Sequence, residues 1–139
     1  VSRLSLHEQS AVKVAEWLED QELVTGVIHP ALPSHPDHAL WQRDFSGSSG
    51  LFAFLLDAAS DRELDAFIDA LEIFSLGFSW GGFESLLIPC DEQLTRRPDD
   101  WTASKTGHLI RVHIGLEDTG DLIADLARGF SALADAKTS

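Results

Sequence analysis

The sequence has few cationic side chains, one cysteine and no long apolar run, and each shortage excludes a class of protein. Its 10 Lys and Arg residues face 23 Asp and Glu residues, for a formal net charge of -13, which would repel a nucleic-acid backbone or an anionic membrane surface. The single cysteine, Cys90, cannot form an internal disulfide. Because a charged leader and a run of membrane-spanning length are also lacking, we predict a cytoplasmic protein without nucleic-acid or membrane partners.

Methionine is also absent, and the first residues lead directly into helical patterning. A translation product normally shows its start, so we expect the chain to be a piece of something longer. Its 139 residues suffice for one hydrophobic core. Since no internal repeat or low-complexity segment divides them, we expect residues 1–139 to form a single domain.

Hydrophobic periodicity predicts an alternation of helices and strands. Apolar residues at helical spacing, each series preceded by a capping Ser or Asp, predict helices over 7–21, over 61–74 and from 118 onward. The capping residues are Ser5 (with Glu8), Ser60 (with Glu63) and Asp118. Apolar or alternating runs predict strands over 23–29, 51–56, 84–88 and 109–116.

The remaining segments are predicted as loops. Residues 30–49 hold three of the five prolines and predict a long loop with a helical turn near 39–41. Residues 92–107 are polar and predict a second loop. The order α, β, β, α, β, β, α predicts an α+β fold, a two-layer sandwich whose mostly antiparallel sheet of about four strands carries helices on one face.

The segment Phe78-Ser79-Trp80-Gly81-Gly82-Phe83-Glu84-Ser85 is the first candidate site. Paired glycines allow positive φ and the close approach of a ligand, although an isolated Gly-Gly pair more often makes only a tight turn. Ser79 and Trp80 stand directly before these glycines. Their position favours a functional interpretation if a partner residue lies elsewhere in the chain.

That partner is Arg111, which lies in the apolar run Leu109-Ile110-Arg111-Val112. A guanidinium in a strand is costly unless paired, and its planar fork matches a carboxylate. From composition alone, a structural ion pair with an acidic residue or an outward-pointing side chain is the better explanation of Arg111, and periodicity does not decide between these interpretations. The period of two places His113 on the same face, where we expect a core or rim histidine.

Other reactive residues give weaker signals. Lys105, in Ser104-Lys105-Thr106, is interpreted as a solvated loop lysine. His35 and His38 have a chelating spacing, but no closely spaced second ligand pair exists, so we predict no metal site. Cys90 has no adjacent base and is expected to be a small, half-buried residue.

The two motifs together resemble the C-terminal domain of the Cys/Met-metabolism family of pyridoxal-phosphate (PLP) enzymes. The residues that carry the resemblance are Ser79 to Leu86 and Arg111 to Leu126, including Gly115-Leu116-Glu117-Asp118. The Ser-Trp-Gly-Gly form resembles the cystathionine β-lyase branch, since many other members have Leu where this chain has Trp80. The resemblance implies that Arg111 and Ser79 hold the substrate α-carboxylate and that Trp80 lines the pocket.

The resemblance also implies parts that this chain lacks. Family members hold their cofactor through a lysine in a Ser-x-Thr-Lys context and through tyrosine and glycine contacts to its phosphate. The chain has no tyrosine, and its lysines are only Lys13, Lys105 and Lys137. It thus contributes no catalytic or cofactor-binding residue. We expect an N-terminal PLP-binding domain to supply them, the chain alone to bind no cofactor and be inactive, and the full-length enzyme to be a homo-oligomer acting on an amino acid.

Two alternatives remain open. A cystathionine γ-synthase, γ-lyase or sulfhydrylase parent would share the fold and Arg111, and only Trp80 argues strongly against it. A free-standing amino-acid-binding or dimerisation domain would use Arg111 without catalysis. The preferred hypothesis is the carboxylate-binding domain of a carbon–sulfur lyase that cleaves cystathionine by α,β-elimination.

Overall fold

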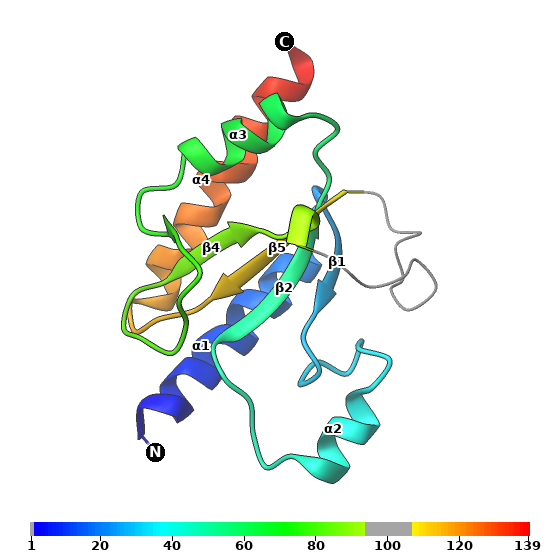
Figure 1. Ribbon diagram of the computed structural model, residues 1–139, viewed down its shortest axis with the longest axis vertical. Coiled ribbons are helices and arrows are strands. Elements are labelled where there is room, and N and C mark those ends of the chain that lie inside the picture. The colour runs from blue at the N-terminus through cyan, green and yellow to red at the C-terminus, as the bar shows by residue number, and fades with distance from the viewer. Residues whose placement is uncertain (1, 94–106) are drawn as a thin grey trace.

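The computed structural model in Figure 1 describes residues 2–93 and 107–139 of the chain. Its helices are α1 (Ser2–Glu19), α2 (His38–Asp44), α3 (Asp61–Asp69) and α4 (Thr119–Thr138), with a 3-10 turn, η1, at Asp91–Gln93. Its strands are β1 (Val24–Ile28), β2 (Leu51–Leu56), β3 (Ser75–Leu76), β4 (Leu86–Pro89) and β5 (His108–His113). Lys105 and most of the predicted loop 92–107 lie outside the described residues.

The strands form one sheet in the order β1-β2-β5-β4-β3. Every neighbouring pair is antiparallel except β3 and β4, which are parallel. The prediction of a mostly antiparallel α+β sheet is confirmed, but the count of about four strands misses β3. This edge strand has only two residues, too few to produce a period-two pattern.

One face of the sheet carries the main core. Phe52, Phe54, Ile110 and Val112 alternate with residues of the opposite face and are almost completely buried. They form one cluster with apolar residues of α1, α3 and α4, the helices that cover this face in Figure 1. The prediction of helices on one face is therefore confirmed.

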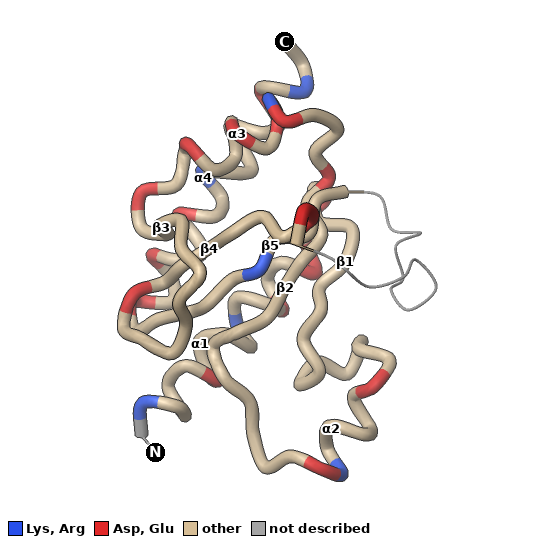
Figure 2. Tube along the Cα trace, in the orientation of Figure 1, with Lys and Arg blue, Asp and Glu red and all other residues tan. Residues whose placement is uncertain are grey.

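The opposite face carries a smaller apolar cluster around Leu55, Leu109 and Cys90. Arg111 lies on this face, opposite Ala53 of β2 and Ile88 of β4. Figure 2 shows acidic positions along α3 and α4, whereas the strands are nearly free of charge. Across the five described strands, Arg111 is the only Asp, Glu, Lys or Arg residue.

Two predicted helix boundaries are wrong for identifiable reasons. The first helix already includes Ser2, so Ser5 lies inside it and its hydroxyl accepts a hydrogen bond from the Gln9 side chain instead of capping the start. The helix predicted over 61–74 ends at Asp69. The backbone N–H groups of residues 72–74 donate to the carboxylate of Asp125 rather than continuing the helix. The caps at Ser60 and Asp118 are confirmed.

Three other boundaries also differ. The turn expected near 39–41 is the seven-residue helix α2. Strand β4 starts at Leu86 rather than at 84, and β5 ends at His113 rather than at 116. The segment just before β4 and the segment just after β5 form hydrogen bonds with each other instead. No helix in the described part of the chain is long and apolar enough to cross a bilayer.

Candidate functional site

The loop between β3 and β4, residues 77–85, is tied to the segment that follows β5. Ser85 donates its backbone N–H to Oε1 of Glu117 (2.9 Å) and its hydroxyl to Oε2 of the same carboxylate (2.7 Å). The Ser85 Oγ accepts the N–H of Gly115 at 2.8 Å, and the carbonyl oxygen of Phe83 accepts the N–H of Leu116 at 2.8 Å. The two sequence motifs are therefore joined by one hydrogen-bond network.

Gly115 permits the close approach on which this network depends. A Cβ atom at Gly115 would lie 2.2 Å from the carbonyl oxygen of Phe83 and 2.7 Å from the carbonyl carbon of Glu84. Both contacts are far inside van der Waals distance and involve backbone, which cannot move aside without displacing the loop. The glycine thus lets the 77–85 loop lie directly against the end of β5.

Two side chains of β5 reach the same loop. Arg111, which is partly buried, donates a guanidinium N–H to the carbonyl oxygen of Phe78. The ring of His113 contacts the backbone of Gly81 and Gly82. Gly81 has a φ of 82°, in the left-handed region that favours glycine, so the paired glycines do form the predicted turn.

Ser79 and Trp80 lie between these two attachments. The residue before them is held by Arg111, and the residues after them are held by His113. Trp80 is 63% exposed and borders a cavity of about 320 Å³ that is also lined by His7 and His113. The structure therefore places Ser79 and Trp80 in the part of the loop between the contacts made by Arg111 and His113.

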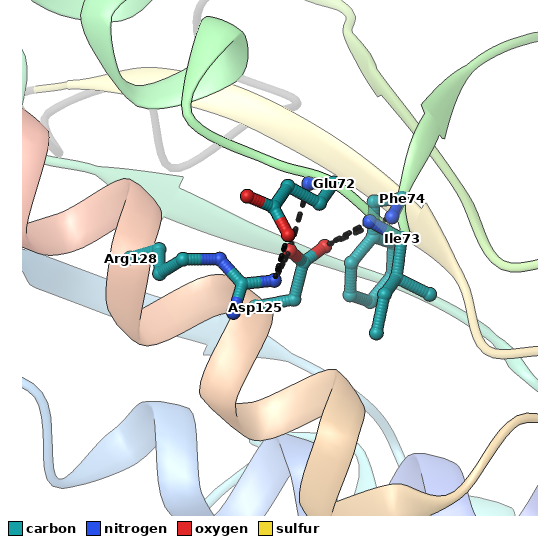
Figure 3. A network of polar contacts seen from close by, with 5 residues as sticks. All are labelled: Glu72, Ile73, Phe74, Asp125 and Arg128. Carbon is teal, nitrogen blue, oxygen red and sulfur yellow. Dashed lines mark hydrogen bonds and ion pairs between the residues drawn. The ribbon is translucent and has the colours of Figure 1, made fainter.

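The entry into this loop is held by the fully buried carboxylate of Asp125 (Figure 3). It accepts the N–H groups of Glu72 (2.8 Å), Ile73 (2.9 Å) and Phe74 (2.9 Å), and it pairs with Arg128 at 2.5 Å. Burial alone would raise the pKa of Asp125, but the three backbone bonds and the guanidinium together lower that pKa below its ordinary value. The carboxylate fixes the chain just before β3.

The arrangement leaves Arg111 available for an anion. Among the residues that the structure describes, no carboxylate forms an ion pair with Arg111, so the structural ion pair considered from sequence is not observed there. Its bond to Phe78 uses one of the five guanidinium N–H donors. The remaining donors, on a largely uncharged sheet face, suit a planar carboxylate.

Sequence reasoning assigned no role to Ser85, Glu117 or Asp125, and it placed His113 only on the correct face. Apart from Arg128, their hydrogen-bond partners lie 30 to 53 residues away in the chain, and hydrogen bonds of this kind leave no periodic pattern. One signal was present: a Gly-x-Glu sequence directly after an apolar strand. Its meaning depends on which loop packs there.

The structure describes two lysines, and neither forms an ion pair with a residue of the 77–85 loop. Lys13 is exposed on α1, and Lys137 forms ion pairs with Glu63 (3.3 Å) and Asp57 (3.8 Å), so neither accompanies Arg111 at the 77–85 loop. Among the described residues no group of three His, Cys, Asp or Glu side chains could hold a metal ion. His35 and His38 each bond instead to a nearby backbone group through Nδ1.

Comparison with known proteins gives consistent results. The protein family described as "Cys/Met metabolism PLP-dependent enzyme" matches residues 1–131. The chain is 48% identical over 133 residues to a cystathionine beta-lyase of Salmonella typhimurium, covering 94% of this chain and 34% of the relative. It is 41% identical over 133 residues to an L-alanine/L-glutamate racemase of Wolbachia pipientis wMel, covering 95% and 33%.

Solved structures agree with the sequence comparison. A crystal structure of cystathionine gamma synthase from Xanthomonas oryzae pv. oryzae, in complex with cystathionine, superposes with a TM-score of 0.84 at 32% identity. The match covers 97% of this chain and 35% of that one. The chain thus spans about a third of the length of the relatives it matches.

Proposed function

The chain belongs to the family of Cys/Met metabolism PLP-dependent enzymes, and from this premise we propose that it is the part of a cystathionine β-lyase-like enzyme that holds the substrate α-carboxylate. The observation that carries the proposal is the placement of Arg111. It is the only charged residue in the described strands, it forms no ion pair with a described acidic residue, and it contacts the loop that bears Ser79 and Trp80.

In this proposal the chain binds and orients, and the bond-breaking groups lie elsewhere. Arg111 and Ser79 grip the α-carboxylate, and Trp80 forms the pocket wall beside it. When the carboxylate is held at a fixed position, the other bonds at Cα point in fixed directions. The substrate is then bound in the orientation that the reaction needs. PLP, the cofactor of this family, supplies the electron sink for the chemistry. The overall reaction is the α,β-elimination of cystathionine to homocysteine, pyruvate and ammonia.

The cofactor-binding part would belong to the remainder of a longer protein. The partial coverage of the relatives supports this, since the chain spans only 34% of the Salmonella enzyme. Exposed apolar side chains in and beside the 77–85 loop also support it, because such a surface suits burial against another domain. They are Leu76, Phe78, Trp80 and Phe83, each more than 60% exposed. We therefore propose one C-terminal domain, inactive alone, within a homo-oligomeric enzyme.

A γ-family parent is the second candidate. The likeness to a cystathionine gamma synthase at a TM-score of 0.84 favours it, whereas Trp80 favours the β-lyase. The products from cystathionine separate the two: the full-length β-lyase would release pyruvate, and a γ-lyase would release 2-oxobutyrate.

The proposal is tested by Arg111→Ala in the full-length enzyme. Loss of a hydrogen-bonded charge contact costs about 1.5–3 kcal/mol, so we expect kcat/KM to fall by roughly 10- to 150-fold. Arg43→Ala is the matched control, since Arg43 is exposed and pairs only with the adjacent Asp44. Equal kinetics for the two variants would remove Arg111 from the substrate site.

A further inference from the structure

His113 is buried at the end of β5, and both of its ring nitrogens face the Gly81–Gly82 turn. It is 3% exposed. Nε2 lies 3.1 Å from the carbonyl oxygen of Gly82, and the backbone nitrogen of Gly81 lies 3.4 Å from Nδ1. A carbonyl oxygen only accepts and a backbone N–H only donates, so Nε2 must carry the proton and Nδ1 must be bare. The two contacts therefore select one neutral tautomer.

The surroundings of the ring also favour the neutral form. Burial lowers the pKa of His113, and the bond to Gly82 only partly opposes this effect. The charged and titratable groups that share its surroundings are His7 and Arg3 of α1, Arg111 of β5, and Glu117 after β5. Of these, His7 and Arg111 lower the pKa and Glu117 raises it. In a protonated ring Nδ1 would also carry a hydrogen, which would face the N–H of Gly81. Two donors cannot bond to each other, so this contact would be lost.

Neighbouring groups fix the position of the ring. His7 lies beside it with a centroid distance of 5.2 Å and is itself held by a 2.7 Å bond from Nδ1 to the carbonyl oxygen of Ile114. On the other side, a Cβ at Gly50 would lie 3.1 Å from Nδ1 and Cε1 of His113, so this glycine lets the ring pack against the start of β2. The ring therefore has little freedom to turn away from the loop.

We propose that His113 is a positioning residue of the carboxylate site: its neutral Nε2–H tautomer holds the Gly81–Gly82 turn and so fixes Ser79 and Trp80 beside Arg111. Arg111 holds the loop on one side of these two residues, at Phe78, and His113 holds it on the other. Arg111 and His113, two positions apart on β5, thus hold the two ends of the short segment that contains Ser79 and Trp80. The consequence for substrate binding rests on the proposed function, but the tautomer and the turn do not.

Nitrogen-15 NMR of the chain tests the contact directly. We expect the ring nitrogens of His113 to show a bare Nδ1 and a protonated Nε2 at neutral pH. The Gly81 amide resonance should shift as His113 titrates, with a midpoint below the ordinary histidine pKa of about 6.5. His113→Phe keeps an aromatic ring but has no nitrogen, so it should abolish this shift, whereas the control His108→Gln, at the other end of β5, should retain it. A protonated Nδ1, or a Gly81 titration that survives in His113→Phe, overturns the proposal.

Kinetics of the full-length enzyme test the consequence. Since in this proposal the ring acts on the substrate only through the loop, His113→Phe should raise KM for the amino acid more than it lowers kcat. His113→Gln, which keeps one donor and one acceptor, should recover part of the loss. If Arg111→Ala raises KM and His113→Phe does not, the positioning role fails while the carboxylate site stands. If neither variant changes kcat/KM, the carboxylate site itself is wrong.

Discussion

Substituting Asn for Asp125 tests whether this buried carboxylate holds the approach to the 77–85 loop. One oxygen, Oδ1, accepts from Glu72 N–H and Arg128, and the other, Oδ2, accepts from the N–H groups of Ile73 and Phe74. Asparagine keeps one oxygen and replaces the other by an NH₂ group, which cannot accept. The less costly orientation keeps the oxygen on Ile73 and Phe74 and turns the NH₂ toward Glu72, because Arg128 is 42% exposed and can be solvated.

The expected loss follows from these contacts. Both bonds to Oδ1 are lost: the one from Glu72 costs about 1.5–3 kcal/mol, and the one from Arg128 costs little because water can replace it. The bonds from Ile73 and Phe74 change from a charged to a neutral acceptor, for roughly 0.5 kcal/mol each. We therefore expect Asp125→Asn to lower the free energy of unfolding by about 2.5–4 kcal/mol. Such a loss is a large part of the stability of an ordinary domain.

Urea denaturation followed by circular dichroism provides the measurement. Asp135→Asn, an exposed position on the same helix, is the control and should change stability by less than about 0.5 kcal/mol. The pKa of Asp125 is lower in the folded chain, so its contribution is complete above the ordinary Asp pKa of about 3.9. It is lost as the pH falls through the folded-state pKa. A difference between the two variants below about 1 kcal/mol at pH 7, or one that stays constant down to pH 3, would refute the reasoning.

Three further substitutions test the other attachments by the same unfolding measurement. Ser85→Ala leaves the N–H of Gly115 without its 2.8 Å acceptor and removes one of the two bonds that Ser85 donates to Glu117, the backbone bond being kept. We expect a loss of about 1–3 kcal/mol, and a loss below 0.5 kcal/mol would contradict the network. Gly115→Ala places a Cβ 2.2 Å from the Phe83 carbonyl oxygen and should destabilise the chain by about 1–3 kcal/mol, whereas Gly82→Ala, with nothing within 4 Å of its Cβ, should not. Ser60→Ala removes the cap on the Glu63 N–H and should lower the free energy of unfolding by about 0.5–2 kcal/mol. The control Ser46→Ala, at an exposed position, should leave it unchanged.

The fold class could be predicted from the sequence because burial imposes a period on the chain. Leu64 and Phe67 repeat at helical spacing and are buried on α3, and Leu122, Leu126 and Phe130 repeat in the same way on α4. The caps at Ser60 and Asp118 are equally local, since each bonds to a backbone N–H three residues away. Interactions within a few residues are visible in the sequence itself.

The ends of elements were less predictable because distant residues decide them. Helix α3 ends at Asp69, and the N–H groups of residues 72–74 bond to a carboxylate more than fifty residues later instead of to helix carbonyl oxygens. Strand β5 stops at His113 because the loop before β4 takes the N–H groups of Gly115 and Leu116. In both cases a competing acceptor, brought near only by folding, replaces the regular backbone bond.

The sequence by itself identified the residues of the candidate site: Arg111 in an apolar strand, and two adjacent glycines after Ser79 and Trp80. It also determined that the chain lacks a tyrosine and that Lys13, Lys105 and Lys137 are its only lysines. Only the tertiary structure decided that Arg111 holds Phe78 and that His113 holds the glycines. The physical reason is that the pleat of a strand places alternate side chains on one face, which the sequence shows. Which loop lies against that face depends on how distant parts of the chain pack together.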